Sequence, residues 1–367
     1  MKKIAIIGGG PGGLTLARLL QVKGFTSVTV YERDVNKEAR VQGATLDLHE
    51  ESGLAALQEG LLMEPFIANY RPGADKMRIL DKDANIIADE HAGKKDETRP
   101  EIDRGPLRKI LLESLTEDTV VWDSQFADME KSGDGWLLHF KNGTTSYADL
   151  VVGADGANSK IRPFITPIRP FFVGMTALEG SVYDAENIVP EMFELVKGGK
   201  LFILGDSKTL IVSAKGDGTL SFYAGFKSSA DWTLNGNLLD WYRREFKGWA
   251  PVYETLFANV SGGFIPRPQY CMPLDQDWEA LPNVTILGDA AHLMPPYAGE
   301  GVNMAMLDAL ELSRCLVKHK NMQEAIEVYE REMRKRASAT AAMTLTQTEL
   351  LHSPEAIRNM MEIVGHV

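Results

Sequence analysis

The stretch KKIAIIGGGPGGLTLARLLQVKGFTSVTVYER, residues 2–33, decides the fold of this 367-residue chain. It reads as a buried strand over Ile4–Ile7, a glycine-rich turn, a helix over Leu14–Gln21 and a second strand that ends in Glu32. A strand, a helix and a second strand in this order are typical of a parallel sheet with helices on its faces. We therefore expect an α/β protein.

The glycines of this stretch form the pattern G-x-G-x-x-G at Gly8, Gly10 and Gly13. The first permits a tight turn, the second lets the backbone approach a pyrophosphate, and the third lets helix and strand pack closely. The pyrophosphate would lie at the N-terminus of the helix. Glu32 follows Gly13 by 19 residues, near the spacing of a carboxylate that binds a ribose 2′-hydroxyl, so FAD or NAD is favoured over NADP. A glycine-rich turn without a ligand is the plainer alternative.

Composition excludes several classes of protein. The net charge of −12, without a long basic run, argues against nucleic acid or a membrane surface as a partner. No stretch approaches the ~20 apolar residues of a membrane span. Cys271 and Cys315 form no redox or zinc-like pair, and the seven His residues are scattered. We expect a soluble, cytoplasmic monomer with no bound metal.

Three further stretches suggest a larger nucleotide-binding fold. DLVVGADGANSKIRPFI (149–165) begins as a strand and turns at Asp155, and PEIDRGPLRKILLESL (100–115) enters an amphipathic helix just after Arg104. NVTILGDAAHLMPP is another strand, ending in a Gly-Asp pair at Asp289. A second G-x-G-x-x-G and a redox Cys pair are both absent from the sequence, which argues against flavoproteins of the disulfide-reductase type. An NAD-dependent dehydrogenase stays open at this point.

These fingerprints resemble those of the class A FAD-dependent aromatic hydroxylases, the p-hydroxybenzoate hydroxylase type. The glycine motif, the turn at Asp155 and the pair at Asp289 occur in the order found in that group, along nearly the whole chain. Within the group, the chain is most similar to the tetracycline-inactivating monooxygenases, and the similarity weakens between about 165 and 270. The most similar stretches are YERD (31–34), EARVQGATLDLHEESG (38–53), PEIDRGPLRKILLESL (100–115) and GDAAHLMPPYAGEGVN (288–303).

The resemblance implies a set of FAD contacts. Glu32 would bind the adenosine ribose and Arg33 would lie along the adenine, while Asp289 would bind the ribityl or pyrophosphate region. A helix N-terminus near Asn303 would present N–H groups to the negative edge of reduced flavin. The further implied contacts are Gly8, Gly10, Gly13, Arg40, Asp47, Arg104, Asp155, Gly301 and Val302.

Some of these residues also have plainer interpretations. Arg104 could pair with Glu101 or Asp103 at the surface. Asp47 could occupy a surface strand position. His292 is a candidate catalytic base, but a His among small alanines is more often packed and hydrogen-bonded. We assign no catalytic side chain, because in this family the flavin carries the chemistry.

The middle and the end of the chain predict further elements. Residues 167–265 alternate apolar and polar positions, and 75–90 does so around a turn, which indicates antiparallel hairpins. Residues 238–257 read as a helix broken near Pro251. The C-terminal segment from Met322 reads as one long helix that bridges two domains; a coiled coil is the alternative, but the heptad is not sustained.

The predicted fold class is α/β: a Rossmann-like FAD-binding domain, an inserted and mainly antiparallel substrate domain, and a C-terminal bridging helix. The expected boundaries are 1–58, 95–166 and 266–320 for the FAD-binding domain, 59–94 and 167–265 for the substrate-binding domain, and 321–367 for the helical segment.

The resemblance also implies a reaction. In the family, NAD(P)H reduces FAD, O₂ adds to form a C4a-hydroperoxide, and its distal oxygen attacks an electron-rich ring carbon. The substrate would be phenolic or enolic, tetracycline- or polyketide-like, which suggests a link to antibiotic resistance. Other small aromatic substrates, an NAD-dependent dehydrogenase and a non-catalytic flavoprotein are the alternatives.

Four residues are the expected substrate contacts. Glu179 and Lys200 occupy positions where tetracycline-inactivating members carry Gln and Arg, and a bidentate Arg contact does not transfer to Lys. Pro296 and Gly299 would face the substrate from the loop after Asp289.

Overall fold

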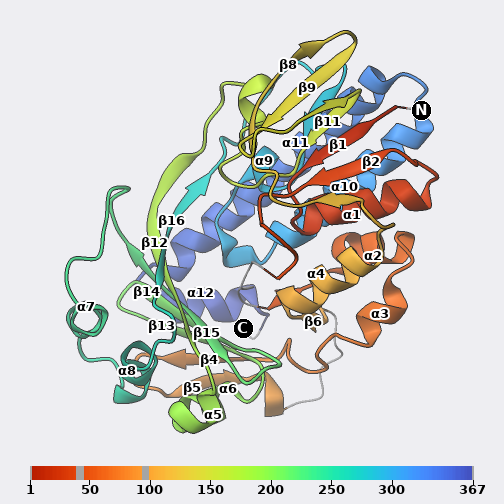
Figure 1. Ribbon diagram of the computed structural model, residues 1–367. Helices are drawn as coiled ribbons and strands as arrows, with labels where there is room; N and C mark the ends of the chain where they lie inside the picture. The colour runs from red at the N-terminus through yellow and green to blue at the C-terminus, as the bar shows by residue number, and fades with distance from the viewer. Residues whose placement is uncertain (1, 39–44, 93–98, 366–367) are drawn as a thin grey trace.

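The computed structural model describes residues 2–38, 45–92 and 99–365. A five-stranded sheet forms one half of the fold, and each of its neighbouring strand pairs is parallel (Figure 1). All four residues of the central strand are buried, as expected for a strand covered on both faces. In spatial order the strands are β17 (Val284–Ile286), β11 (Leu150–Gly153), β1 (Ile4–Ile7), β2 (Val28–Tyr31) and β7 (Val120–Val121).

Helices pack around this sheet and share one apolar core with it. The N-terminal helix α1 contacts α4 and α10, and α10 contacts α11. The predicted Rossmann-like unit of strand, glycine turn, helix and strand is confirmed. The helices in this part of the chain are α1 (Pro11–Val22), α2 (Ala55–Glu59), α3 (Met63–Ile67), α4 (Arg104–Glu113), α9 (Asp289–His292) and α10 (Gly301–Lys318), with short turns η1 (Glu50–Leu54), η3 (Arg162–Phe164) and η4 (Pro296–Ala298).

A three-stranded antiparallel sheet packs on the same core, and our sequence analysis did not include it. Trp136, Leu138 and Phe140 are its alternating buried residues. The Asn142-Gly143 pair between alternating stretches is the hairpin signal that predicts it. Its strands are β8 (Phe126–Ser132), β9 (Gly135–Phe140) and β10 (Thr145–Ala148), and a separate pair is β3 (Leu46–Asp47) with β6 (Glu101–Ile102).

A seven-stranded sheet forms the second half of the molecule, and it is antiparallel except where β13 and β4 pair in parallel. The hairpins predicted over 75–90 and 167–265 are confirmed, and they join into one sheet. In spatial order the strands are β16 (Ile265–Cys271), β12 (Phe171–Val182), β15 (Leu220–Lys227), β14 (Lys208–Ala214), β13 (Lys200–Gly205), β4 (Met77–Asp81) and β5 (Ile86–Asp89), followed in the chain by the turn η2 (Glu90–Ala92).

One face of this sheet is covered by helices, which bury a second apolar core. The expected break near Pro251 is confirmed, because the proline occupies the first position of a new helix. The domain boundaries stay a proposal, which we extend so that the substrate part includes all of β16. The covering helices are α5 (Ala185–Ile188), α6 (Pro190–Val196), α7 (Leu238–Glu245) and α8 (Pro251–Ala258).

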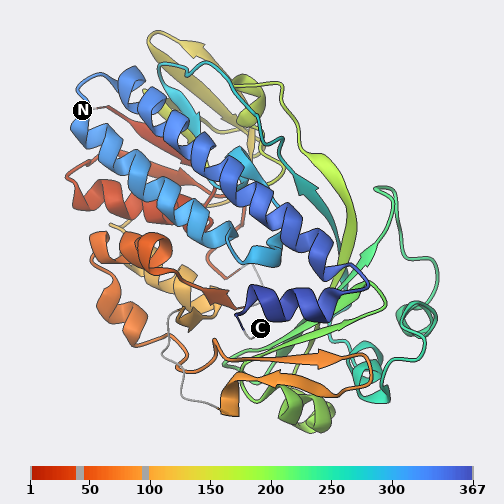
Figure 2. The same cartoon turned by 180° about the vertical axis from the view of Figure 1, so that it is seen from behind.

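The long helix α11 (Met322–Leu351) runs from the parallel sheet to the seven-stranded sheet (Figure 2). Tyr329 and Met333 pack in the core of the first sheet, whereas Leu351 packs against the second. The predicted bridge is therefore present, but the C-terminus holds a further helix, α12 (Ala356–Ile363), which the sequence analysis did not separate. Pro354 explains the break, because proline disfavours helical conformation in the residue before it. Within the described ranges, no helix has the length and apolar character needed to cross a membrane.

Candidate functional site

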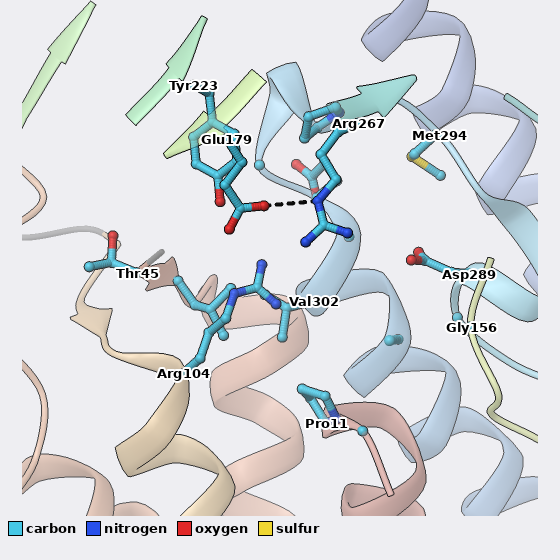
Figure 3. Close-up of a pocket in the computed structure, with 18 of the residues that line it drawn as sticks. Pro11, Thr45, Arg104, Gly156, Glu179, Tyr223, Arg267, Asp289, Met294 and Val302 are labelled. Carbon is cyan, nitrogen blue, oxygen red and sulfur yellow. Dashed lines mark hydrogen bonds and ion pairs between the residues drawn. The ribbon is translucent and has the colours of Figure 1, made fainter. Parts of the chain in front are cut away.

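A cavity of about 1630 Å³ opens between the two large sheets (Figure 3). The strands β1, β11 and β17 are parallel, so their carboxyl ends meet at one edge, where ligands of such sheets bind. Gly8, Asp155 and Asp289 follow these three strand ends, and all three line the cavity. The three fingerprints of the sequence therefore come together at one site.

The glycine loop fits a bound pyrophosphate. A Cβ on Gly8, where φ is +113°, would lie 2.3 Å from the carbonyl oxygen of Ala154, and one on Gly13 would lie 2.1 Å from the carbonyl oxygen of Gly8. These two glycines are required by the packing of the protein itself. A Cβ on Gly10 would meet no protein atom within 4 Å. Gly10 therefore leaves open space on the cavity side, where a ligand can approach the backbone.

Two helix N-termini face this cavity. Gly10 caps α1 and Glu300 caps α10, and neither helix start is capped by a side-chain hydrogen bond or carries an acid in its first turn. The unpaired N–H groups of a first turn and the helix dipole favour negative charge. The start of α1 fits a pyrophosphate, and the start of α10, with Gly301 and Val302 on the cavity wall, fits a second negative group.

Glu32 lies at the end of β2 and lines the cavity beside Arg33. It is 3% exposed, and its carboxylate accepts hydrogen bonds from the backbone N–H groups of Gly9, at 2.5 Å, and of Asp34, at 3.0 Å. The carboxylate is thus held rigidly against the glycine loop. This is the position that the resemblance assigns to a ribose contact, and that role stays a prediction.

Two carboxylates of the cavity wall, Asp155 and Asp289, flank the strand ends. Oδ2 of Asp155 accepts from the backbone N–H of Lys160 at 2.6 Å, whereas its buried Oδ1 has no hydrogen-bond partner among the described residues. The side chain of Asp289 is exposed to the open cavity (Figure 3). Loss of hydration raises the pKa of both carboxyls. For Asp289, the charges of His292 and Arg104 act in the opposite direction but do not cancel this increase. Such carboxylates need donors, which the hydroxyls or N–H groups of a cofactor can supply.

Asp47 lies on the cavity wall, with its side chain 19% exposed, rather than on a surface strand. Burial raises its pKa, but a 3.1 Å hydrogen bond from His49 and the charge of Lys200 outweigh burial, so that the net pKa is lowered. The carboxylate is therefore ionised and held in place at neutral pH.

The structure modifies the prediction for Asn303. Its side chain is fully buried and is not part of the cavity wall: Oδ1 accepts from the backbone N–H of His49 and Nδ2 donates to the carbonyl of Asp47, both at 2.9 Å. The side chain thus clamps the segment of Asp47 to α10. A cofactor contact by Asn303 stays possible only through its backbone N–H, in the first turn of that helix.

Replacing Asn303 by Ala leaves two buried backbone groups without partners. We expect Asn303→Ala to lower the free energy of unfolding by about 1–3 kcal/mol and to weaken FAD binding, because Asp47 loses its support. Urea denaturation and FAD titration measure the two effects. Ser52→Ala is the matched control, since it removes only the 3.2 Å hydrogen bond from the hydroxyl to Asn303. Equal effects in the two variants would contradict the clamp.

Arg104 begins α4, and its guanidinium points into the cavity (Figure 3). Of the two surface partners that the sequence offered, Glu101 forms an ion pair with Lys200, and Asp103 forms one with Arg71 at 3.3 Å. The predicted place of Arg104 at the cofactor site is therefore consistent with the cavity. The candidate at position 40 lies outside the described residues.

His292 is not part of the cavity wall, and it is 3% exposed. Its Nε2 lies 2.5 Å from Oδ2 of Asp308, which is fully buried and also accepts from the backbone N–H of Gly288 at 2.9 Å. Oδ1 of Asp308 accepts from Arg336 at 2.8 Å. The network joins α9, α10 and α11, so the interpretation of His292 as a packed, hydrogen-bonded residue is confirmed.

Residues 278–344 match a family of FAD binding domains, and 6–36 match a family of NAD(P)-binding Rossmann-like domains. Monooxygenase asqM of Emericella nidulans is 29% identical and covers 85% of this chain and 83% of its own. The crystal structure of a putative FAD containing monooxygenase from Photorhabdus luminescens has a TM-score of 0.80 and 26% identity, covering 96% and 98% of the two chains. Along nearly its whole length, the chain is similar to FAD-dependent monooxygenases.

These findings support FAD as the cofactor of this monooxygenase and NAD(P)H as its reductant, and they remove the alternative of an NAD-dependent dehydrogenase. The tetracycline destructase Tet(55) has a TM-score of 0.80 with 20% identity, over 100% of this chain and 95% of its own. That likeness shows a shared fold.

Two of the four substrate residues expected from the sequence lie on the opposite wall of the monooxygenase's cavity. Glu179 on β12 accepts from Nε of Arg267 on β16 at 2.9 Å, and Lys200 on β13 pairs with Glu101. Pro296 and Gly299 face the same space from the loop before α10. All four reach the cavity, and their contact with substrate stays a prediction.

Several residues of the wall were missed from the sequence. Arg267 and Tyr223 line the cavity, as do Met360 and Ile363 from α12. Their places depend on which strands and helices become neighbours, for which the sequence carries no local signal.

Proposed function

We propose that this monooxygenase uses NAD(P)H and O₂ to hydroxylate an electron-rich phenolic or enolic ring in a tetracycline- or polyketide-like substrate. The observation that carries the proposal is the single cavity that runs from the glycine loop to the seven-stranded sheet. Its volume of about 1630 Å³ exceeds the ~300–1,000 Å³ of pockets for one drug-sized ligand. A cofactor and a substrate of several rings therefore fit side by side. A smaller aromatic substrate is the alternative.

FAD, when bound, supplies the electron transfer and oxygen activation. The residues of the chain bind FAD, orient the substrate and shield the reacting ring from water. The first turns of α1 and α10 offer N–H groups to negative charge, and Asp289 and Asp155 offer acceptors near the strand ends. The seven-stranded sheet, α11 and α12 close the other side and exclude water from the reacting ring.

The test is an absorbance spectrum of the purified protein followed by NADPH and NADH oxidation with tetracycline and a panel of phenols. We expect the two bands of oxidised flavin, substrate-stimulated oxidation, and a product that is heavier by one oxygen atom. No flavin bands after addition of FAD would overturn the proposal. Oxidation with simple phenols but not with tetracycline would favour the smaller aromatic substrate.

Removal of the carboxylate at position 289 tests the cofactor site. We expect Asp289→Ala to weaken FAD binding at least about tenfold, because hydrogen bonds to a charged group contribute ~1.5–3 kcal/mol. Burial raises the pKa of this carboxyl, so its charged form destabilises the FAD-free protein at neutral pH. The melting temperature of FAD-free Asp289→Ala should therefore not fall. Unchanged FAD affinity would contradict the assigned role.

The matched control is Asp277→Ala. Asp277 pairs with Arg334 at 3.0 Å, but its side chain is 82% exposed. We expect FAD affinity to stay at the wild-type value in this control.

A further inference from the structure

The cavity face of the seven-stranded sheet has a polarity gradient. Successive residues of a strand point to opposite faces, and here one face packs on α6–α8 while the other faces the cavity. The strand register places four cavity residues in one row across neighbouring strands: Glu179 opposite Tyr223, Tyr223 opposite Ile211, and Ile211 opposite Phe202. The row begins with a carboxylate and ends with apolar side chains.

The polar end of the row is the ion pair between Glu179 and Arg267. Nε of Arg267 donates to Oε2 of Glu179 at 2.9 Å, and neither side chain has another hydrogen-bond or ion-pair partner within the described ranges. The guanidinium of Arg267 points from β16 toward the middle of the cavity, where Arg104 and Val302 face it from the opposite wall (Figure 3). The remaining oxygen of Glu179 and the Nη groups of Arg267 thus provide an acceptor beside donors.

Structural support alone does not account for this pair. The side chain of Arg267 is 52% exposed, and exposed ion pairs contribute only ~0–1 kcal/mol to stability. Pro266 and Pro268 lie on either side of Arg267 in the edge strand β16 and restrict its backbone. The chain therefore holds a poorly stabilising charge pair in a fixed position on a cavity wall.

The apolar end of the row continues into the C-terminal helices. Phe202 packs in the same cluster as Met360 of α12 and Leu351 of α11, and all three line the cavity. From Glu179 to Phe202 the row crosses three interstrand steps of ~4.8 Å, or about 14 Å. This length exceeds one substituted ring and suits three or four fused rings.

From these contacts we infer that the monooxygenase recognises a fused-ring substrate through a neutral edge that has an N–H or O–H donor beside a carbonyl acceptor. This inference rests on the proposed function and specifies its substrate class. The carbonyl of a lactam or an enolised diketone accepts from Arg267, and the neighbouring N–H or O–H donates to Glu179. Because the two protein charges cancel, a free carboxylate at this edge meets repulsion from Glu179 as well as attraction to Arg267. The ring body lies along Tyr223, Ile211 and Phe202.

The test compares three tricyclic probes on the FAD-loaded enzyme without NAD(P)H. Phenanthridin-6(5H)-one carries the donor–acceptor edge, phenanthridine lacks it, and phenanthridine-6-carboxylate replaces it with a negative charge. Changes in flavin absorbance or isothermal titration calorimetry report the dissociation constants. We expect the lactam to bind at least about tenfold more tightly than either other probe.

Two variants separate recognition from support of the fold. In Glu179→Gln, the charge of Arg267 is no longer balanced, so the carboxylate probe should gain about tenfold in affinity and approach the affinity of the lactam. In Arg267→Gln, the lactam should lose about tenfold while the carboxylate does not gain. Phenanthridine, which has one ring-nitrogen acceptor and no donor at this edge, should change least in affinity among the three probes. A merely structural pair would shift the affinities of all three probes together.

A matched control pair lies outside the cavity. Arg243 and Glu254 have the same Nε to Oε1 distance of 2.9 Å between α7 and α8. Arg243→Gln and Glu254→Gln should leave all three dissociation constants unchanged.

Three outcomes would overturn the inference: no binding of the lactam up to its solubility limit, tighter binding of the carboxylate by the wild type, or uniform shifts in the two cavity variants. Each leaves the proposed function in place as long as FAD binds and NAD(P)H oxidation responds to a phenol. Failure of those two readouts would instead overturn the proposed function.

Discussion

Gly10→Ala is expected to fold like the wild type and to lose FAD. A methyl group at this position meets no protein atom within 4 Å, and the backbone angles of −78° and 179° are open to alanine. The FAD-free protein should therefore keep its stability within about 1 kcal/mol. The methyl group occupies the space where a pyrophosphate approaches the helix start. Loss of two hydrogen bonds to a charged group costs ~3–6 kcal/mol, so FAD affinity should fall at least about 100-fold.

Gly13→Ala is the matched variant. Its Cβ would lie 2.1 Å from the carbonyl oxygen of Gly8, so α1 has to move away from β1. We expect a loss of FAD binding together with a loss of ~1–3 kcal/mol in the stability of the FAD-free protein. FAD titration of the deflavinated proteins and urea denaturation without FAD measure the two effects separately. Wild-type FAD affinity in Gly10→Ala would contradict the pyrophosphate assignment.

Asp308→Asn is expected to cause the largest loss of stability outside the glycine loop. The buried carboxylate balances His292 and Arg336, and it also accepts from the backbone N–H of Gly288. Breaking a buried charge network by removing one partner costs about 3–5 kcal/mol. Urea denaturation of the FAD-free protein near pH 6 measures this loss.

The same network makes stability depend on pH. Burial lowers the pKa of His292, but the charge and hydrogen bond of Asp308 outweigh burial and raise it overall. The stabilisation is therefore complete below the unfolded value of 6.5 and declines as the pH rises through the raised pKa. For Asp308, burial raises the pKa, but the charge and hydrogen bond of His292 outweigh it, so this stabilisation is lost only as the pH falls below 3.8. The network should therefore stabilise the folded protein most between pH 3.8 and pH 6.5.

The variants separate the two partners of Asp308. Asp308→Asn should flatten the decline of stability above pH 6.5, because His292 loses the charge that raises its pKa. Arg336→Gln keeps the pair of His292 and Asp308, so it should lower stability but preserve that decline. An unchanged slope in Asp308→Asn would show that another group controls this pH dependence.

The cofactor half of the site was predictable because its signals are local. Gly8, Gly10 and Gly13 lie within six residues, and their turn, approach and packing roles follow from backbone sterics alone. Asp155 and Asp289 each follow a short apolar strand, and parallel strands end at one edge. Even here the local pattern gave no role for the side chain of Asn303, because the residues that it clamps are 254 and 256 positions away in the sequence.

The substrate half was not predictable to the same depth. The alternation of apolar and polar residues identified the hairpins. Which residues lie opposite one another on neighbouring strands depends instead on the strand order and register of the whole sheet, as for Glu179, Tyr223, Ile211 and Phe202. The pair of Glu179 and Arg267 joins strands that are 88 residues apart. The wall made by α12 likewise depends on where α11 ends.

By itself, then, the sequence determined an FAD site at the carboxyl edge of a parallel sheet, because a strand, a glycine turn and a helix start are set by neighbouring residues. Only the tertiary structure decided which side chains face the cavity from the seven-stranded sheet, which act as clamps behind the cavity wall, and where the charged end of that sheet's cavity face lies. The physical reason is that a side chain's partners in a sheet are set by register between distant strands, whereas its face is set by its own strand.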